Sequence, residues 1–329
     1  MSTRREFITL LGGAAAWPMA ARAQQSDRVR HIAVLVGSAE HETDIQERLA
    51  GFRQGLERLG WSEGGNIRMD IRFAAGQADR YPMLVRELVS RNPDVILAQS
   101  PPIALTFQRE TRTIPIVFTS VSDPIGAGLV TSLARPGANL TGVLQYEAGI
   151  AGKWLAMLKE IAPGLERAAL LCNPSTTAYD YWLQAARTAA HALAVELVPT
   201  PVVSAADPEQ AIAGFAHVPN GALLLPPDST TIIHRDVIIA LAARHRVPAV
   251  YSLRVFVSAG GLMAYGTNQV EQFRQAASYV DRILRGAKPE DLPVQAPTKY
   301  ETTLNLKAAK TIGLEVPASL LVRADEVIE

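Results

Sequence analysis

Short apolar runs alternate with longer amphipathic stretches along most of this chain, and this alternation constrains the fold more than any other feature. The run 31–36 (HIAVLV) is almost wholly apolar, which is typical of a strand buried on both faces of a parallel sheet. Residues 44–59 follow with apolar side chains at helical spacing and end before Gly60, a common helix stop. This part of the chain therefore predicts a strand followed by a helix.

The same pattern continues in two series. The first predicts further strands at 67–73, 94–98 and 114–118 and a helix at 81–91. The second predicts helices at 148–161, 181–193, 231–245 and 269–284 and strands at 168–172, 222–225, 248–251 and 261–265. Two such series indicate an α/β fold with two doubly wound parallel-sheet lobes, joined by a hinge near residues 142–152. A length of 329 residues agrees with about two domains.

The N-terminus has the pattern of an export signal. Arg4 and Arg5 precede an apolar run at 10–16, and the A-x-A sequence at 21–23 resembles a cleavage site. The apolar run is much shorter than the roughly 20 residues that a membrane span needs. The paired arginines followed by Glu and Phe resemble a twin-arginine signal. We therefore predict that residues 1–23 are a twin-arginine signal peptide, removed near Ala23, and that the protein works in the periplasm.

Recognisable catalytic and metal-binding motifs are absent from the sequence. The six histidines form no H-E-x-x-H pair, and neither a G-x-S-x-G elbow nor a phosphate loop occurs. The single cysteine, Cys172, excludes an internal disulfide and a thiolate zinc cluster. Lys plus Arg and Asp plus Glu both number 32, and this balance argues against a nucleic-acid binder. We expect no enzyme activity, no cofactor and no metal.

The glycine-rich segment 123–128 (DPIGAG) is the nearest approach to a phosphate-binding loop. It follows a predicted strand and is expected to precede a helix, whose amides could hold an anion. It lacks the third glycine of a dinucleotide fingerprint. An exported enzyme with a Rossmann-like pair of domains is therefore the alternative, although no sequence motif supports it.

Several segments together resemble one family of exported binding proteins. They are 121–129 (VSDPIGAGL), 133–142 (LARPGANLTG), 261–266 (GLMAYG), 276–289 (AASYVDRILRGAKP), 292–295 (LPVQ), 305–310 (NLKAAK) and 323–328 (RADEVI). As a set they resemble the ABC-transporter substrate-binding family related to tryptophan- and tyrosine-uptake binding proteins. The likeness spans essentially the whole chain after the signal.

The resemblance implies a type I periplasmic-binding fold, in which the chain crosses between the lobes three times. An N-terminal lobe of residues 28–146 plus 268–300 and a C-terminal lobe of 147–267 plus 301–329 would follow. The resemblance also implies capture of a small organic solute for delivery to a membrane ABC permease. An amino acid, aromatic or otherwise apolar, is the first candidate for this solute, and aromatic acids and other small carboxylates are the alternatives. We expect a monomer with no nucleic-acid partner. A ligand-sensing domain that serves a signalling partner would give the same sequence pattern.

The candidate ligand-binding residues lie where predicted strands end, because ligands of open α/β sheets bind beyond the carboxyl ends of the strands. The set comprises Ser38, Glu40, Gln99, Ser100, Ser120, Ser122, Asp123, Asn173, Ser175, Asp228, Ser252, Tyr265 and Asn268. Hydroxyls and helix amides suit a carboxylate, and an aspartate suits an ammonium group.

Most of these residues have an ordinary structural alternative. Serines before helices are usually N-caps, and Asp123 before Pro124 is often a turn residue. Asp228 is equally suited to capping a helix. Tyr265 and Tyr251 are the candidates to cover an apolar ligand side chain, although Tyr265 can simply end a strand.

Overall fold

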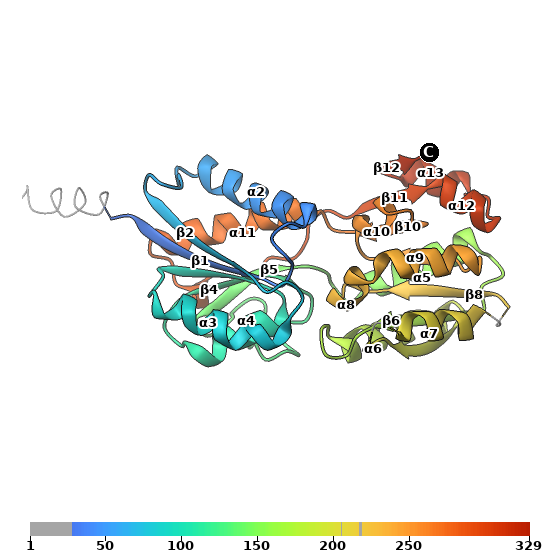
Figure 1. The fold of residues 1–329 in the computed structure, drawn as a ribbon, viewed down its shortest axis with the longest axis horizontal. Helices are drawn as coiled ribbons and strands as arrows, with labels where there is room; N and C mark the ends of the chain where they lie inside the picture. The colour runs from blue at the N-terminus through green and yellow to red at the C-terminus, as the bar shows by residue number, and fades with distance from the viewer. Residues whose placement is uncertain (1–27, 205, 217–218) are drawn as a thin grey trace, which may run out of the picture.

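The computed structural model describes residues 28–329 apart from residue 205 and residues 217–218. The predicted signal at 1–23 therefore lies outside the described residues. The chain forms two α/β units side by side, and each unit is a sheet covered by helices on both faces (Figure 1). Most strand pairs are parallel, as the sequence predicts.

The first sheet has five strands in the order β2-β1-β3-β4-β5. Its strands are β1 (Arg30–Val36), β2 (Ile67–Phe73), β3 (Val95–Gln99), β4 (Ile116–Val121) and β5 (Leu140–Leu144). The central strands are buried almost throughout, which explains their continuous apolar runs. The carboxyl ends of these strands point toward the second sheet (Figure 1).

The second sheet has seven strands in the order β12-β11-β10-β9-β8-β6-β7. Its strands are β6 (Arg167–Cys172), β7 (Glu196–Pro201), β8 (Gly221–Leu225), β9 (Ala249–Tyr251), β10 (Met263–Gly266), β11 (Glu301–Asn305) and β12 (Glu326–Ile328). Strand β11 runs antiparallel to β10, whereas the other pairs are parallel. The sheet is therefore mixed only at the edge that the last part of the chain adds.

Helices and short 3₁₀ turns cover both sheets. Around the first sheet lie α2 (Thr43–Arg58), η1 (Ala78–Arg80), α3 (Tyr81–Ser90), α4 (Pro101–Glu110), α11 (Gln269–Leu284) and η2 (Pro289–Asp291). Around the second lie α5 (Ile150–Ile161), α6 (Tyr179–Ala192), α7 (Asp207–Ala216), α8 (Ser229–Ile233), α9 (Arg235–Arg244), α10 (Arg254–Ser258), α12 (Leu306–Ile312) and α13 (Ala318–Arg323). Each sheet has two apolar cores, one on each of its faces.

The chain passes between the two sheets three times. It leaves the first sheet after β5, returns from β10 into α11, and leaves again before β11. Helix α11 packs against α2 at close range, because Gly51 and Gly55 have no side chain where Val270 and Ala277 approach. Three tyrosines stack beside the crossings: the ring centroids of Tyr265 and Tyr300 lie 5.6 Å apart, and those of Tyr146 and Tyr300 lie 6.2 Å apart.

The predicted elements agree with the structure except at a few places. The helix predicted over 231–245 is two helices, α8 and α9, because His234 (φ −96°, ψ 16°) leaves helical geometry between them. The helix expected after the segment 123–128 is missing, because residues 124–128 form turns and residues 129–139 contain no helix. Strands β5, β7, β11 and β12 were not predicted. In β7, Pro199 and Pro201 and a largely exposed face conceal the strand pattern.

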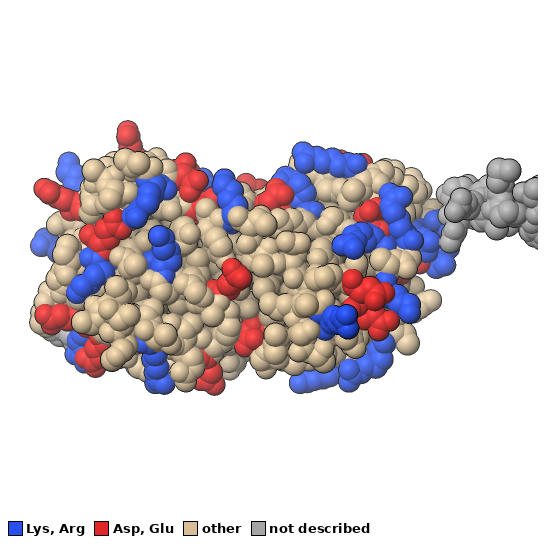
Figure 2. Space-filling view, turned by 180° about the vertical axis from the view of Figure 1, so that it is seen from behind, with Lys and Arg blue, Asp and Glu red and all other residues tan. Residues whose placement is uncertain are grey.

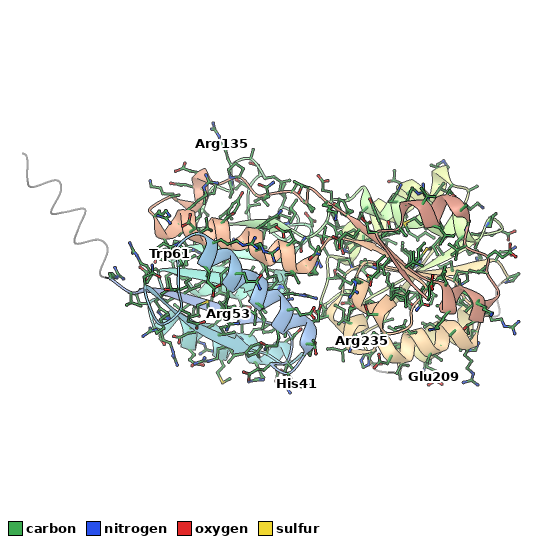
Figure 3. All side chains as sticks on the ribbon, turned by 90° about the horizontal axis from the view of Figure 1, so that it is seen from above. His41, Arg53, Trp61, Arg135, Glu209 and Arg235 are labelled. Atoms are coloured by element: carbon green, nitrogen blue, oxygen red, sulfur yellow. The ribbon has the colours of Figure 1, made fainter. Side chains whose placement is uncertain are left out.

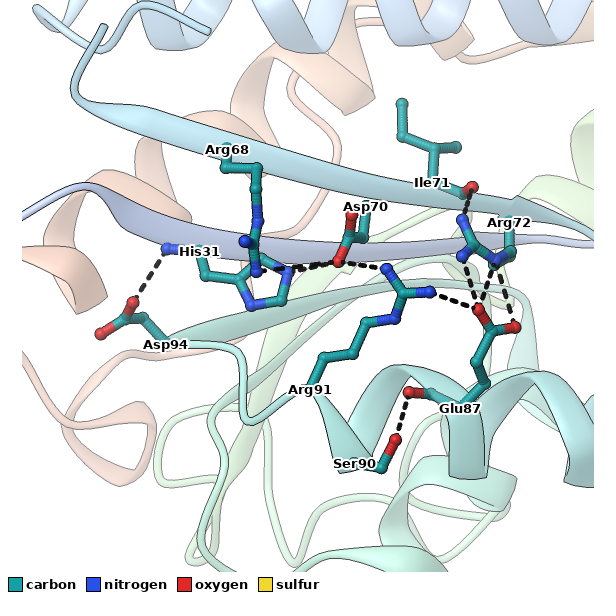
Figure 4. A network of polar contacts seen from close by, with 9 residues as sticks. All are labelled: His31, Arg68, Asp70, Ile71, Arg72, Glu87, Ser90, Arg91 and Asp94. Atoms are coloured by element: carbon teal, nitrogen blue, oxygen red, sulfur yellow. Dashed lines mark hydrogen bonds and ion pairs between the residues drawn. The ribbon is translucent and has the colours of Figure 1, made fainter. Parts of the chain in front are cut away.

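Polar residues from the amino end of β1, from the edge strand β2 and from α3 and the residue after it form a network, called here the β1–β2 network (Figure 4). The Nε2 atom of the buried His31 lies 2.8 Å from Oδ2 of Asp70, and Arg91 donates to the same oxygen at 3.2 Å. Glu87 accepts hydrogen bonds from both Arg72 and Arg91. Burial of Asp70 is outweighed by its hydrogen bonds from His31 and Arg91, so its pKa is lowered. Hydrogen bonds from Arg72 likewise lower the pKa of Glu87.

Candidate functional site

Two hollows lie between the facing edges of the sheets. The smaller, called the serine pocket, has a volume of about 50 Å³. It is lined by Arg48, Gln99, Ser100, Pro101, Ser120, Ser122, Gln145, Thr176, Thr177, Ala178, Pro227, Asp228, Ser229, Ile232 and Leu253. The larger hollow has a volume of about 490 Å³ and shares Arg48, Ile232 and Leu253 with it. Figure 3 shows His41 and Arg235 on the facing edges of the two halves, and Arg235 lines the larger hollow.

Ser100 and Ser120 occupy the carboxyl ends of neighbouring strands and line the serine pocket. Both are only 9% exposed, and neither Oγ atom has a hydrogen-bond partner within the described part of the chain. Both also have positive φ angles, 89° for Ser100 and 57° for Ser120. Ser100, with ψ of 153°, lies in a region that is nearly exclusive to glycine. Backbone strain together with unsatisfied buried hydroxyls is a combination that marks functional sites.

The capping alternative does not apply to Ser100. It stands at the N-cap position of α4, but its side chain makes no capping hydrogen bond there. The amides of that helix are also a poor carboxylate cradle, since Pro101 and Pro102 have no N–H. The start of α4 therefore offers two amide donors fewer at this end of the pocket than an ordinary helix does.

Gln99 and Arg48 add further donors to the same pocket. The Oε1 atom of Gln99 accepts a hydrogen bond from the Gly37 amide at 2.8 Å, which orients the side-chain amide. Arg48 is 5% exposed, donates to Asp44, and has no partner for Nε among the described residues. Sequence analysis missed Arg48. Its signal was a charged residue on the apolar face of the helix, between Ile45 and Leu49.

Asp228 faces this donor cluster from the second half. Its carboxylate caps α8 by accepting from the Thr231 amide at 2.9 Å and also accepts from the Thr176 hydroxyl. Burial raises the pKa of Asp228 despite these hydrogen bonds. A buried carboxylate with this environment is stabilised when a cationic group arrives beside it. Capping and ligand binding are thus compatible roles for Asp228.

The structure brings five of the nominated residues to the serine pocket: Gln99, Ser100, Ser120, Ser122 and Asp228. Asn173 lies close to it, because its Nδ2 donates to Thr230 Oγ1 at 2.9 Å and its Oδ1 accepts from the Ser175 amide. That second bond is an Asx-turn. Ser175 itself is exposed.

Three nominated residues near the carboxyl ends of the first sheet are placed in turns and outside the lining of both hollows. The carbonyl of Ser38 accepts from the Ala75 amide, and Glu40 is exposed. Asp123 accepts from the Gly126 amide at 2.8 Å. This turn role is the structural alternative that the sequence allowed.

The remaining nominated residues lie toward the crossings. Ser252 is fully buried, and its Oγ has no partner in the described residues. Asn268 lines the larger hollow and caps α11 by accepting from the Glu271 amide. Tyr265 lines a separate hollow beside Lys153 and Arg323.

Four further features of the described residues concern metal ligation, membrane spans, the single thiol and surface charge. They contain no group of three or more His, Cys, Asp or Glu side chains arranged to hold a metal ion. None of their helices combines the length and the apolar character of a membrane span. Cys172 is buried at the end of β6, and burial raises the pKa of its thiol. On the face seen in Figure 2, positive and negative side chains are interspersed.

Two α/β sheets with a polar pocket between their facing edges define the class of two-lobed ligand-binding proteins. The sequence places the protein within that class. The chain belongs to the ABC transporter substrate binding protein family, whose model matches residues 31–328.

Individual relatives agree with this assignment. The chain is 26% identical over 276 residues to a tyrosine-binding protein of Clostridioides difficile, covering 84% of this chain and 79% of that protein. It also resembles the crystal structure of an ABC domain from Streptococcus pneumonia in complex with L-Trp, with a TM-score of 0.84, 23% identity and coverage of 91% and 99%. A ligand-free, open substrate binding protein with adhesive properties from Clostridium difficile gives a TM-score of 0.71, 24% identity and coverage of 91% and 99%.

Proposed function

We propose that this chain is the exported solute receptor of an ABC importer, which captures a small organic solute between its lobes and delivers it to a membrane permease. The observation that carries the proposal is the cluster of buried donors without partners in the described residues, at Ser100, Ser120 and Arg48. Buried polar groups in native proteins are normally hydrogen-bonded, so a bound ligand is the natural partner for these atoms.

An amino acid is the ligand class with most support. The donors on the first half suit a carboxylate, and Asp228 on the second half suits an ammonium group. The tyrosine-binding relative and the L-Trp complex described above are consistent with this class. Because the donors and Asp228 belong to different halves, one ligand can hold both halves together and favour a closed form.

The lobes proposed for this movement are residues 28–146 plus 268–300 and residues 147–267 plus 301–329. The packing of α11 on α2 and the pairing of β11 with β10 support this division. Export to the periplasm is supported by the paired arginines Arg4 and Arg5 and by the family. Cell fractionation of the full chain and of a variant with Lys at both positions tests the route, and we expect the variant to stay inside the cell.

Thermal unfolding of the purified protein against a panel of amino acids and small carboxylic acids tests the function. A ligand at about 100 times its Kd adds about 2.7 kcal/mol to the free energy of unfolding. We expect Ser120→Ala to weaken this stabilisation and the exposed control Ser90→Ala to keep it, since Ser90 lies in the β1–β2 network region away from the pocket. A panel with no stabilising member, or full stabilisation of Ser120→Ala, would contradict the proposal.

A further inference from the structure

We propose that Thr176 is a positioning residue of the amino-acid site, because its hydroxyl ends a chain of hydrogen bonds that holds the Asp228 carboxylate as the acceptor for an ammonium group. This inference rests on the proposed function and concerns how one end of the ligand is recognised. The chain, called here the Asp228 chain, joins Asn173, Thr230, Thr176 and Asp228. It links the segment after β6 to the start of α8, beside the serine pocket that Thr176 and Asp228 both line.

The direction of each hydrogen bond in the Asp228 chain follows from which atoms can donate. Oδ1 of Asn173 accepts from the Ser175 amide at 2.8 Å, so the other end of the Asn173 side chain is its NH₂ group, which only donates. This group donates to Thr230 Oγ1 at 2.9 Å. The Thr176 hydroxyl donates its single hydrogen to Oδ1 of Asp228. Thr230 must therefore be the donor in the contact of 3.3 Å between its Oγ1 and that of Thr176.

Every donor in the Asp228 chain thus points toward the carboxylate. Hydrogen bonds arranged head to tail polarise one another, so Asn173 and Thr230 strengthen the last bond, from Thr176 to Asp228. An ionised carboxylate only accepts hydrogen bonds, which agrees with this direction. A proton on Oδ1 would compete with the Thr176 hydrogen, whose other acceptor is the more distant Asn173 carbonyl at 3.5 Å. The chain therefore favours the charged form of Asp228.

The burial of Asp228 makes this support important. Asp228 is 3% exposed, and burial raises its pKa because water cannot solvate the charge. The hydrogen bond from Thr176 is the largest of the effects that oppose this rise. The other opposing hydrogen bonds come from backbone groups, so Thr176 supplies the one donor that a substitution can remove.

The Asp228 carboxylate keeps room for a further donor. Oδ1 accepts from Thr176 and Oδ2 accepts from the Thr231 amide at 2.9 Å, so both oxygens are held in place from different segments. A carboxylate has about four lone-pair sites, which leaves about two for an ammonium group that enters the serine pocket. Thr176 thus orients the carboxylate without occupying its capacity to bind the ligand.

Few other charged or titratable groups face Asp228. Arg48 lines the same pocket from α2, and an arginine keeps its charge throughout the accessible pH range. Cys172 at the end of β6 interacts electrostatically with Asp228, but burial raises the pKa of its thiol, which is therefore neutral in neutral and acidic solution. Helix α8 contains no charged residue. Asp228 is therefore the group of this pocket whose ionisation responds to mild acid.

Carbon NMR titration of the purified protein, labelled at the aspartate carboxyl carbons, tests the inference without a ligand. The Asp228 signal is identified by its loss in Asp228→Asn, in which Asn still caps α8. Thr176→Val keeps the shape of the side chain and removes the hydroxyl, so we expect the Asp228 titration midpoint to rise by about one pH unit, the scale of one hydrogen bond to a charged group. Thr176→Ser keeps the hydroxyl and should titrate like the unchanged protein. An unchanged midpoint in Thr176→Val would overturn the proposal.

Calorimetric titration with the amino acid that most stabilises the protein in the unfolding panel extends the test to binding. In mildly acidic solution we expect Thr176→Val to raise the Kd about tenfold and to release more protons on binding, because Asp228 must lose its proton to accept the ammonium group. Proton release is measured from the binding heat in two buffers that differ in their heat of ionisation. Thr176→Ser should restore both quantities.

The exposed Thr188→Val on α6 is the matched control and should change neither the Kd nor the proton release. Weaker binding by Thr176→Val with unchanged proton release, or no recovery in Thr176→Ser, would show that Thr176 only holds its segment in place and would overturn the proposal. If no amino acid of the panel binds, the proposed function fails and the role toward an ammonium group fails with it. The NMR titration then still shows separately whether Thr176 sets the charge of Asp228.

Discussion

Two polar regions of the first sheet, one along the edge strand β2 and one at the carboxyl ends of β3 and β4, differ in whether their side chains have partners. In the β1–β2 network, His31, Asp70 and Glu87 each have a side-chain partner. At the carboxyl end, Ser100 and Ser120 are equally buried and lack partners in the described chain. Strand geometry does not by itself decide which of these side chains have hydrogen-bond partners. We infer that the β1–β2 network contributes stability, whereas the carboxyl ends of β3 and β4 hold the proposed ligand site.

The largest change in ligand affinity is expected from a substitution of Arg48 in the serine pocket. Arg48→Met keeps the apolar stem and removes the charge, so we expect the Kd for the amino acid that the unfolding panel identifies to rise by about 10- to 150-fold, or about 1.5–3 kcal/mol. Asp44, its partner, is 38% exposed and can be hydrated once the guanidinium is gone. We therefore expect little change in the free energy of unfolding. Calorimetry and urea unfolding measure the two quantities, and an unchanged Kd would remove Arg48 from the site.

The opposite result is expected in the β1–β2 network. Asp70→Ala leaves the buried His31 without its acceptor, and we expect the free energy of unfolding to fall by about 1–3 kcal/mol. Affinity for ligand should stay the same, because neither Asp70 nor His31 lines either hollow. The exposed Asp79→Ala is the control and should change stability by less than about 0.5 kcal/mol. Loss of affinity in Asp70→Ala without loss of stability would break the comparison.

A single substitution at Ser100 should move stability and affinity in opposite directions. Glycine tolerates the φ of 89°, so Ser100→Gly relieves strain and should raise the free energy of unfolding by about 1 kcal/mol. Loss of the hydroxyl should weaken ligand binding by about 0.5–1.5 kcal/mol. Urea unfolding and calorimetry of the same preparation test both parts. A variant that is less stable and binds normally would show that Ser100 is structural.

The smallest effects on stability and affinity are expected from a change of pH, and they differ between the β1–β2 network and the serine pocket. The pKa values of Asp70 and Glu87 are lowered in the folded protein, so their stabilisation is complete above the ordinary values of 3.8 and 4.5 and is lost as the pH falls below them. The pKa of Asp228 is raised by burial, so Asp228 takes up a proton above pH 3.8 when no ligand is bound. Affinity for an amino acid should therefore fall on acidification before stability does. Affinity and the free energy of unfolding are measured at stepwise lower pH. A loss of stability at a higher pH than the loss of affinity would contradict this prediction.

Much of the fold was accessible from the sequence because buried strands leave continuous apolar runs. The strands ending at Val36, Cys172 and Leu225 were predicted for this reason. The three crossings were not derivable from periodicity, because pattern shows that α11 is a helix but not which sheet it covers. They came only from the family resemblance.

The candidate site was predicted less completely. Strand-end position identified Ser100, Ser120 and Asp228, which line the serine pocket. It also selected Asp123, whose oxygen caps a turn, because sequence cannot distinguish a turn residue from a ligand-facing one. Arg48 was missed because the candidates were chosen only at the ends of predicted strands, and Arg48 lies within the helix α2. A cation on an apolar helix face is the signal that would have found it.

Determination of a crystal structure with the stabilising amino acid of the panel bound tests the central claim most directly. The account predicts that the amino acid lies between the two sheets, with its carboxylate within hydrogen-bond distance of Ser100 and Ser120 and its ammonium group beside Asp228. An amino acid bound elsewhere on the surface, with the hydroxyls of Ser100 and Ser120 satisfied by neighbouring protein groups, would contradict it.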